Sequence, residues 1–264
     1  MVKSWNGISL VICDVLGIIL VIRLLSLRLH RVYRVFCAYL IFGLLSSSMY
    51  FVDIALRALD YRVTYVSVVL GTWVLTWWMV YSLLEAILAR LPGILKFSRV
   101  LLSVVFALAI LLGMVAIRSQ FMLAESQYGL RSLGFAVAIA ILWERFVVIV
   151  SLVALLAIQA FVLWFPVQLP RNLVFFSIGF VFNFVCEAAL LVIRERWPTV
   201  MAAITDPANL LVLSVSFAYF AITITSAGEF IPMRIGHRWH PAEQERLVQQ
   251  LENINDALLR TVRH

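Results

Sequence analysis

Long apolar runs alternate with short polar connections along the whole chain. Seven runs approach or exceed the roughly 20 mainly apolar residues that a helix needs to cross a bilayer. Each run is continuous and lacks two-residue alternation, so the pattern predicts helices and not the strands of a membrane barrel. The predicted spans are Gly7 to Leu27, Val35 to Leu56, Val63 to Leu88, Val100 to Ile117, Leu133 to Phe165, Asn172 to Ile193 and Leu210 to Ile231.

The prolines support this partition. All seven fall in predicted connections or at predicted span ends, where a missing backbone donor does least damage. We therefore predict an all-α polytopic membrane protein, a seven-transmembrane-helix bundle with a short cytoplasmic C-terminal helix. Residues 1–233 form the predicted transmembrane domain, and residues 234–264 form a cytoplasmic juxtamembrane segment and an amphipathic or coiled-coil helix. The N-terminal run has no small-residue cleavage site, so we expect it to stay attached as an anchor.

The fifth run is longer than a simple span. A helix from Leu133 to Phe165 would extend about 50 Å at about 1.5 Å per residue, well beyond the hydrocarbon thickness. Either Phe146 to Phe165 crosses alone, with Glu144 and Arg145 at the outer interface, or a steeply tilted helix buries that pair in the bundle. We favour the interfacial arrangement because it avoids burying two charges.

Composition rules out a soluble globular domain. Of the 264 residues, 64% are hydrophobic and 13% are charged, and the mean hydropathy is +1.01, whereas soluble domains carry about 25% charged residues. The net charge is +7, but the basic residues are scattered through short connections, which argues against nucleic-acid binding. Cys13, Cys37 and Cys186 lie singly in apolar runs, so we expect neither disulfides nor a thiolate metal site.

Arginine and lysine positions predict the orientation, because cytoplasmic loops carry an excess of both residues. The bias is strongest across the first span, which Lys3 precedes and Arg28, Arg31 and Arg34 follow. We expect a multi-pass protein of the cell inner (cytoplasmic) membrane, with the N-terminus outside and the C-terminus cytoplasmic. The preference for arginine over lysine suggests a bacterial source.

Carboxylates in the predicted outer half of the bundle are the first candidates for a site. Asp14 and Glu187 lie inside apolar runs, where an unpaired charge is costly and requires a partner. Arg145 and Arg194 are the candidate partners. Asn183 precedes Glu187 by four residues, so the two share one face of a helix.

Tryptophans add an aromatic wall. Trp73 and Trp77 lie too deep in the third run for the usual interfacial belt, and a buried indole normally seeks an acceptor. Ordinary interhelical hydrogen bonds and packing are the alternative explanation for each of these residues. The sequence-based hypothesis is a ligand pocket that opens outward and is lined by Asp14, Trp73, Trp77, Arg145, Asn183 and Glu187.

Several chemistries lack the residues that they require. A retinal Schiff base needs a lysine in a late span, and haem or metal sites need histidines inside the bundle, whereas all four histidines fall in a loop or the tail. His237 and His240 are three residues apart, but no further ligand lies alongside them. Phosphate-binding glycine loops, GxSxG elbows and HExxH helices are absent from the sequence. We therefore expect no enzyme activity, no cofactor and no metal.

The tail predicts one more helix after Pro241. Leucine and isoleucine recur there at spacings of four, three and four residues, which is the a/d pattern of a coiled-coil seam. The helix either lies on the membrane or the loops, or it binds a partner or a second copy of the chain. The predicted partner-binding residues are Leu247, Leu251, Ile254 and Leu258.

Seven helices, an outward polar pocket and a cytoplasmic helix resemble, in layout alone, the membrane modules of bacterial sensor proteins. The leading hypothesis is a sensor or receptor-like protein that binds a small ligand and signals through its tail to a partner or a homodimer. A proton- or cation-coupled carrier or channel component is the first alternative, with Asp14, Asp53 and Glu187 as the groups that handle the ion. A structural subunit of a membrane complex is the second alternative. Contact with the lipid bilayer is common to all three.

Overall fold

The computed structural model of the chain is almost entirely helical. It describes the backbone of residues 2–56, 61–89, 91–128, 133–165, 167–234 and 240–261. Within these ranges it describes all side chains except those of residues 2–6, 50–56, 61–62, 109, 112–128, 133–138, 141–142, 145, 195, 198–203, 234, 241–242 and 261.

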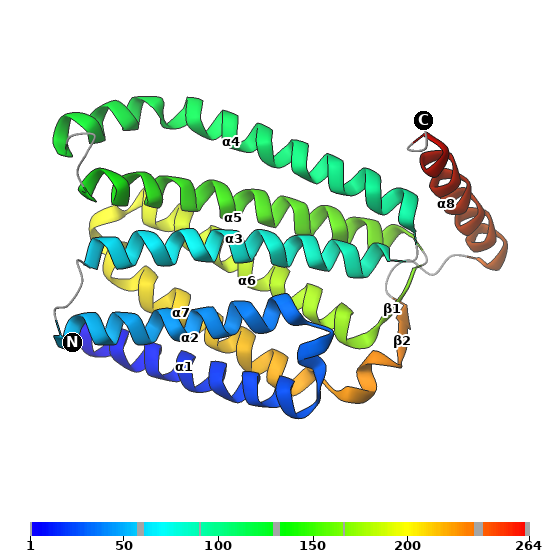
Figure 1. Cartoon of the computed structure of the whole chain (residues 1–264), viewed down its shortest axis with the longest axis horizontal. Coiled ribbons are helices and arrows are strands. Elements are labelled where there is room, and N and C mark those ends of the chain that lie inside the picture. The colour runs from blue at the N-terminus through cyan, green and yellow to red at the C-terminus, as the bar shows by residue number, and fades with distance from the viewer. Residues whose placement is uncertain are drawn as a thin grey trace.

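Long helices that run up and down make up the bundle (Figure 1). They are α1 (Val2–Ser26), α2 (Arg34–Leu56), α3 (Tyr61–Leu88), α4 (Pro92–Tyr128), α5 (Leu133–Trp164), α6 (Arg171–Arg196) and α7 (Pro198–Thr223), followed by α8 (Pro241–Thr261). Two 3₁₀ turns, η1 (Leu29–Arg31) and η2 (Ser226–Glu229), and an antiparallel pair of strands, β1 (Gln168–Pro170) and β2 (Pro232–Arg234), lie beside the helix ends. We call the end of the bundle where α1, α3, α5 and α7 finish the α8 end.

Local backbone chemistry sets several helix ends. Arg28 adopts a left-handed conformation with φ of 56°, which reverses the chain between α1 and α2. Pro198 begins α7 directly after Trp197, at a position where the missing N–H of proline is harmless. Helix α7 ends at Thr223: the N–H of Ile224 still donates to the carbonyl oxygen of Phe220 at 3.1 Å, but Ile224 itself takes an extended conformation with ψ of 125°.

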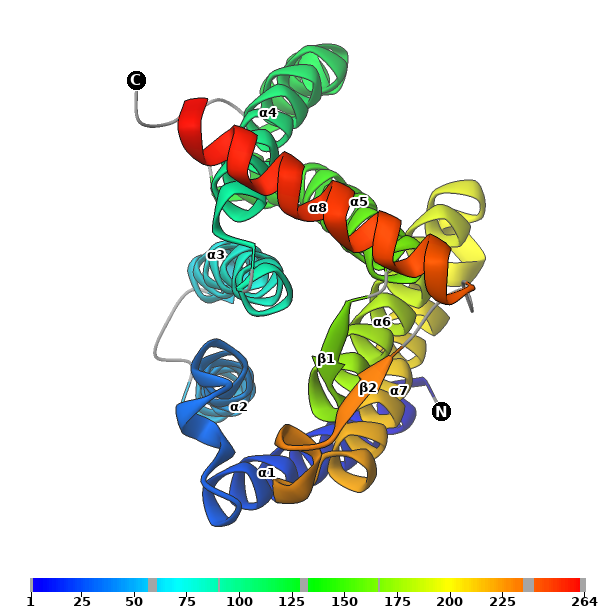
Figure 2. The ribbon, with the colours of Figure 1, turned by 90° about the vertical axis from the view of Figure 1, so that its right-hand side faces the viewer.

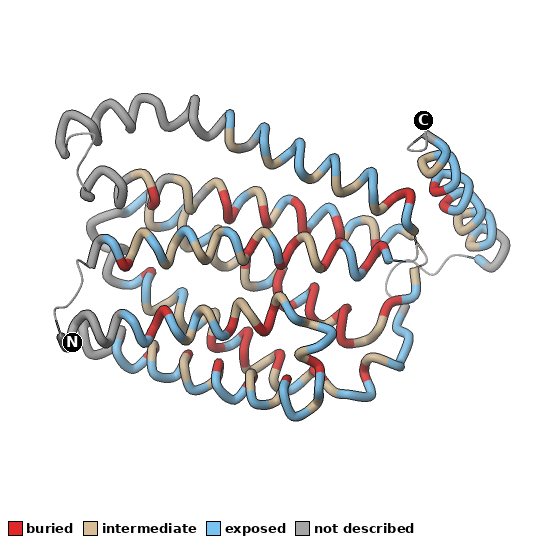
Figure 3. The backbone as a smooth tube through the Cα atoms, in the orientation of Figure 1, coloured by how far each residue is buried: buried red, intermediate tan, exposed pale blue. Residues whose placement is uncertain are grey.

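Phenylalanine rings form the centre of the buried core. Phe36 of α2, Phe176 and Phe180 of α6, and Phe220 of α7 pack together with ring centroids 4.5 to 5.5 Å apart. Gly179 allows this approach, because a Cβ there would overlap the ring of Phe220. Exposed residues lie mostly on the outward sides of the helices (Figure 3), and many are large and apolar, as lipid contact requires.

The all-helical, multi-pass membrane prediction is confirmed, but the count of seven spans is not. Five helices in the described part of the chain are long and apolar enough, by length and composition, to cross a membrane. These segments are Gly7–Ser26, Val63–Leu88, Phe146–Trp164, Arg171–Arg194 and Ile204–Thr223. The described part of α2, Arg34–Met49, forms a shorter apolar helix.

The last long helix differs from its predicted boundaries. We expected a span from Leu210 to Ile231, whereas α7 begins at Pro198 and ends at Thr223. Pro207, expected in a connection, lies inside the helix. Because the chain leaves the helix after Thr223, Ser226 and Glu229, which lie within the predicted span, belong instead to η2.

The tail helix packs back on the bundle. Figures 1 and 2 show α8 across the α8 end, where it contacts α4. The buried Asn255 Oδ1 accepts hydrogen bonds from the backbone N–H groups of Gly93 (2.8 Å) and Ile94 (3.4 Å) at the start of α4. Leu251 is buried, whereas Ile254 is 50% exposed. The face of α8 that contacts α4 therefore differs from the predicted seam: Asn255 is buried in place of Ile254.

Candidate functional site

Two carboxylates from adjacent helices line one cavity inside the bundle. The cavity has a volume of about 220 Å³, and its polar and aromatic lining consists of Tyr39 from α2, Thr72, Trp73 and Thr76 from α3, Glu144 from α5, and Phe184 and Glu187 from α6. We call it the acidic cavity. Glu144 lies in the first half of α5, which runs toward the α8 end, and Glu187 lies in the second half of α6, which runs away from it. The acidic cavity therefore lies in the half of the bundle opposite α8.

The charge of this cavity defines what it can hold. Glu144 and Glu187 are close enough for electrostatic repulsion between them. Two negative charges in a region of low dielectric constant favour a cation or a shared proton between them. Trp73 and Tyr39 add aromatic rings, whose faces attract positive charge. The arrangement suits a small cation better than an anion.

The structure groups some predicted site residues and separates others. Trp73 and Glu187 line the acidic cavity together. Asn183 lines a small adjoining space with Tyr39 and Phe184, and its Oδ1 accepts a hydrogen bond of 3.4 Å from the hydroxyl of Ser216. Asn183 is thus next to the acidic cavity but not part of its lining.

Trp77 lines a larger, mainly apolar cavity of about 950 Å³ between α3, α4 and α5, to which Trp73 also contributes. Its ring packs against Phe106 with a centroid separation of 3.6 Å. Among the described residues, the buried indole N–H groups of Trp73 and Trp77 have no hydrogen-bond partner.

Asp14 lies apart from the acidic cavity. Its Oδ2 accepts a 2.6 Å hydrogen bond from Ser47, which joins α1 to α2. The carboxylate therefore has the polar partner that an acidic group requires in an apolar environment, although that partner is a hydroxyl and not the expected arginine.

Of the two predicted arginine partners, only Arg194 has a described side chain. Arg194 pairs with Asp206 of α7 at 3.6 Å, so this ion pair joins α6 to α7 and does not involve Glu187. The side chain of Arg145 lies outside the described residues, as does that of Asp53, which we assigned to ion handling in a carrier.

A polar network at the α8 end was not anticipated from sequence. The hydroxyl of Tyr33 donates a 2.6 Å hydrogen bond to Glu229 Oε1, and Nδ2 of the fully buried Asn172 donates to the same oxygen at 2.7 Å. Asn172 also donates to the carbonyl oxygen of Thr225 at 2.7 Å and accepts from the Thr225 N–H at 3.2 Å. Gly228 lies so close to Asn172 that a Cβ would overlap its amide. The network joins the connection between η1 and α2, the start of α6 and the segment after α7.

Burial of Tyr33 raises the pKa of its phenol, and the hydrogen bond to Glu229 raises that pKa further. The phenol consequently keeps its proton and remains a donor at physiological pH. The sequence signal for this network was Glu229, an acidic residue near the end of the predicted span from Leu210 to Ile231. Its partner Tyr33 is 196 residues away in the chain, so no local pattern could identify the pair.

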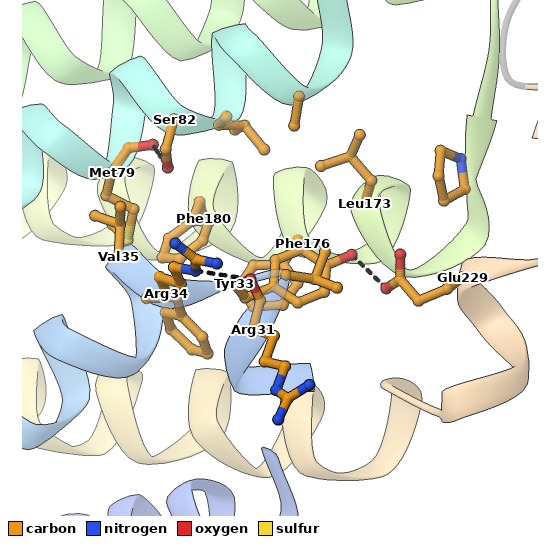
Figure 4. Close-up of a pocket in the computed structure, with 15 residues that line it drawn as sticks. Arg31, Tyr33, Arg34, Val35, Met79, Ser82, Leu173, Phe176, Phe180 and Glu229 are labelled. Atoms are coloured by element: carbon orange, nitrogen blue, oxygen red, sulfur yellow. Dashed lines mark hydrogen bonds between the residues drawn. The ribbon is translucent and has the colours of Figure 1, made fainter. Parts of the chain in front are cut away.

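Beside this network lies a second cavity, of about 330 Å³ (Figure 4). Arg31, Arg34, Tyr33 and Glu229 contribute its polar groups, and Met79, Leu173, Phe176 and Phe180 are among its apolar groups. We call it the arginine cavity. The ring of Tyr33 stacks on Phe176 with centroids 4.5 Å apart, so the polar network forms one wall of the cavity.

In the described part of the chain, no three or more His, Cys, Asp or Glu side chains are placed to hold a metal ion. Comparison with protein-family models, curated proteins and solved structures finds no match to this chain.

Proposed function

We propose that the chain is a non-enzymatic, receptor-like membrane protein that binds a small organic cation in the acidic cavity. The observation that carries the proposal is that Glu144 and Glu187 line one cavity together with Trp73 and Tyr39. Carboxylates supply charge complementarity, and aromatic faces add cation–π attraction, a combination that recognises ammonium groups. The sensor hypothesis drawn from sequence thus gains a ligand class.

Helix α6 connects the acidic cavity to the α8 end. Helix α6 carries Glu187 in its second half and begins beside Asn172, which is bonded to Glu229 and Thr225. A ligand that shifts α6 would move this network and the β1–β2 pair, through which the chain continues to the tail. We infer that α8 then passes the change to a cytoplasmic partner or a second copy of the chain, with Leu247, Leu251, Ile254 and Leu258 as the contact residues.

The proposed topology retains seven spans, with the N-terminus outside and the tail cytoplasmic in a bacterial inner membrane. Its support is geometric: α2 runs back along the bundle after α1, and α4 runs back after α3 along the outer edge of the bundle beside α5 (Figure 1). In this topology α2 and α4 traverse the bundle in addition to the five helices that meet the length and composition criteria. The basic residues after α1 place that end in the cytoplasm under the positive-inside rule.

Binding of choline and of tetramethylammonium to the protein in nanodiscs tests the ligand class. Glu187→Gln should weaken binding roughly tenfold or more, because one of the two charges that hold the cation is lost. Asp206→Asn is the matched control, since it also neutralises a carboxylate but at an exposed pair outside the cavity. Equal affinity of the wild type and Glu187→Gln would reject the cavity as a cation site.

The two neighbouring carboxylates also fit the alternative of a proton- or cation-coupled carrier. Reconstituted liposomes separate the two functions. Protein-dependent proton or sodium flux that Glu187→Gln abolishes would favour the carrier, whereas binding without flux would favour the receptor.

A further inference from the structure

We propose that the arginine cavity binds the phosphate-bearing headgroup of an anionic phospholipid, with part of an acyl chain inside it. The proposal concerns the α8 end of the bundle and does not depend on the cation site in the opposite half. It rests on three features of the cavity: its depth in the bundle, its change from polar to apolar lining, and its net positive charge.

The cavity lies where the helices leave the apolar zone. Residues 31 to 36 line it where α2 begins, and Leu173 lines it just after α6 begins. On α3 the lining extends from Ala86, near the helix end, to Met79, about 2.5 helical turns before Leu88. It therefore reaches from the headgroup level into the hydrocarbon level.

Polarity changes in the same direction as depth. Arg31 and Arg34 are exposed, whereas Met79, Phe176 and Phe180 are buried and apolar. Figure 4 shows Arg34 beside Tyr33 and Phe180, and Arg31 on the adjoining turn. A phospholipid has the same gradient, with a charged phosphate above an apolar chain. A water-soluble phosphate ester would leave the apolar interior unused.

The cavity carries a net positive charge, because the guanidinium groups of Arg31 and Arg34 outnumber the single carboxylate of Glu229 in its lining. Among the described residues, neither Arg31 nor Arg34 forms an ion pair, and the Arg34 Nε–H is directed to the carbonyl oxygen of Arg31 at 3.1 Å. Glu229, the acidic residue of the lining, already accepts hydrogen bonds from Tyr33 and Asn172. Two guanidinium groups at a membrane interface bind an anionic phospholipid more strongly than a zwitterionic one.

Native mass spectrometry of the protein, released from mixed phosphatidylglycerol and phosphatidylcholine membranes, tests the proposal directly. The wild type should retain phosphatidylglycerol in preference to phosphatidylcholine by roughly tenfold. The double variant Arg31→Gln/Arg34→Gln should lose most of that preference. Arg99→Gln should keep it, because Arg99 lies at the same end but pairs with Glu85 and does not line the cavity.

A second variant tests the apolar interior without altering charge. Ser82→Phe fills space beside Met79 and Leu83, so it should reduce the amount of retained lipid of either headgroup class. Circular dichroism confirms that each variant keeps its helices. The proposal is overturned if the double variant retains phosphatidylglycerol as the wild type does, or if Ser82→Phe leaves retention unchanged.

Inorganic phosphate separates a lipid site from a site for a free anion. Millimolar phosphate should leave the retained phosphatidylglycerol in place, because phosphate alone cannot occupy the apolar interior. Displacement of the lipid by phosphate would show that the cavity recognises a free anion and would overturn the lipid assignment.

Discussion

Glutamate side chains have different surroundings at the two ends of the bundle. At the α8 end, Glu229 is bonded to Tyr33 and Asn172 and contributes to a network that holds three segments together. In the opposite half, Glu187 and Glu144 share a cavity in which they repel each other. A carboxylate that accepts hydrogen bonds from protein donors stabilises the fold, whereas two carboxylates that line one cavity together attract a cation to it.

This comparison distinguishes structural from functional acidic residues by the groups around each carboxylate, and not by how deep the residue lies in the membrane. Both Glu187 and Glu229 lie within predicted spans, although the sequence-based hypothesis assigned only Glu187 to a site. Their partners differ, and so the expected consequences of changing them differ as well. The predictions below use that difference.

Gly228→Ala should have the largest effect on stability. Its Cβ would overlap the amide of Asn172, so the network would have to open or shift. We expect a loss of about 3 kcal/mol in the free energy of unfolding, measured by detergent-induced unfolding. Gly43→Ala is the control, because an added Cβ meets nothing within 4 Å there. Equal effects of the two changes would contradict the proposed close packing at Gly228.

Tyr33→Phe should lower the free energy of unfolding by about 1 to 2 kcal/mol, because Glu229 loses its shorter hydrogen bond. The folded-state pKa of Tyr33 is raised, so its contribution is fully present below the ordinary phenol pKa of 10.0 and is lost as pH rises above that value. The variant should therefore flatten the alkaline part of the stability profile. Tyr81→Phe, which removes a hydroxyl without a hydrogen bond among the described residues, should leave that profile unchanged.

Asn255→Ala should release α8 from α4, because the N–H of Gly93 loses its side-chain acceptor. Trypsin cleavage at Arg246 or Arg260 should become roughly fivefold faster, as expected for the loss of about 1 kcal/mol of local stability. Ile254→Ala should leave cleavage unchanged, since Ile254 is half exposed. Faster cleavage of the Ile254 variant alone would favour the a/d seam predicted from sequence over the docked arrangement.

Glu187→Gln should have the smallest effect on the free energy of unfolding, within about 0.5 kcal/mol, because it removes one of two repelling charges and, among the described residues, no side-chain hydrogen bond. Glu229→Gln should instead cost about 1 kcal/mol, because a neutral acceptor binds its two donors less strongly. Unfolding of both variants in the same detergent measures the difference. If Glu187→Gln were the more destabilising change, Glu187 would be a structural residue.

The sequence predicted the helices better than their contacts. Uninterrupted apolar runs identified the regions of α1 to α7, and the tail pattern identified α8. The end of α7 at Thr223 was missed, because apolar residues continue through Ile224 to Ile231 although the backbone leaves the helix there. Hydropathy reports burial in lipid or protein but not the hydrogen bonds of Asn172 that hold this segment extended.

Only part of the candidate site was predicted, because local sequence patterns do not report contacts between distant segments. Helical spacing correctly places Asn183 and Glu187 near one another, but it cannot determine which neighbouring helix they face. The structure brings Trp73, Tyr39 and Glu144 to Glu187, and leaves Asp14 with Ser47. Each of these pairings depends on the rotation and neighbours of a whole helix, which local spacing does not encode.

By itself the sequence determined that this chain is helical and resides in a membrane, because the transfer of apolar runs from water to lipid depends on local composition. Only the tertiary structure decided which carboxylates are satisfied and which share a cavity. That outcome depends on contacts between segments as distant as Tyr33 and Glu229, whose distances and angles follow from the packing of the complete bundle.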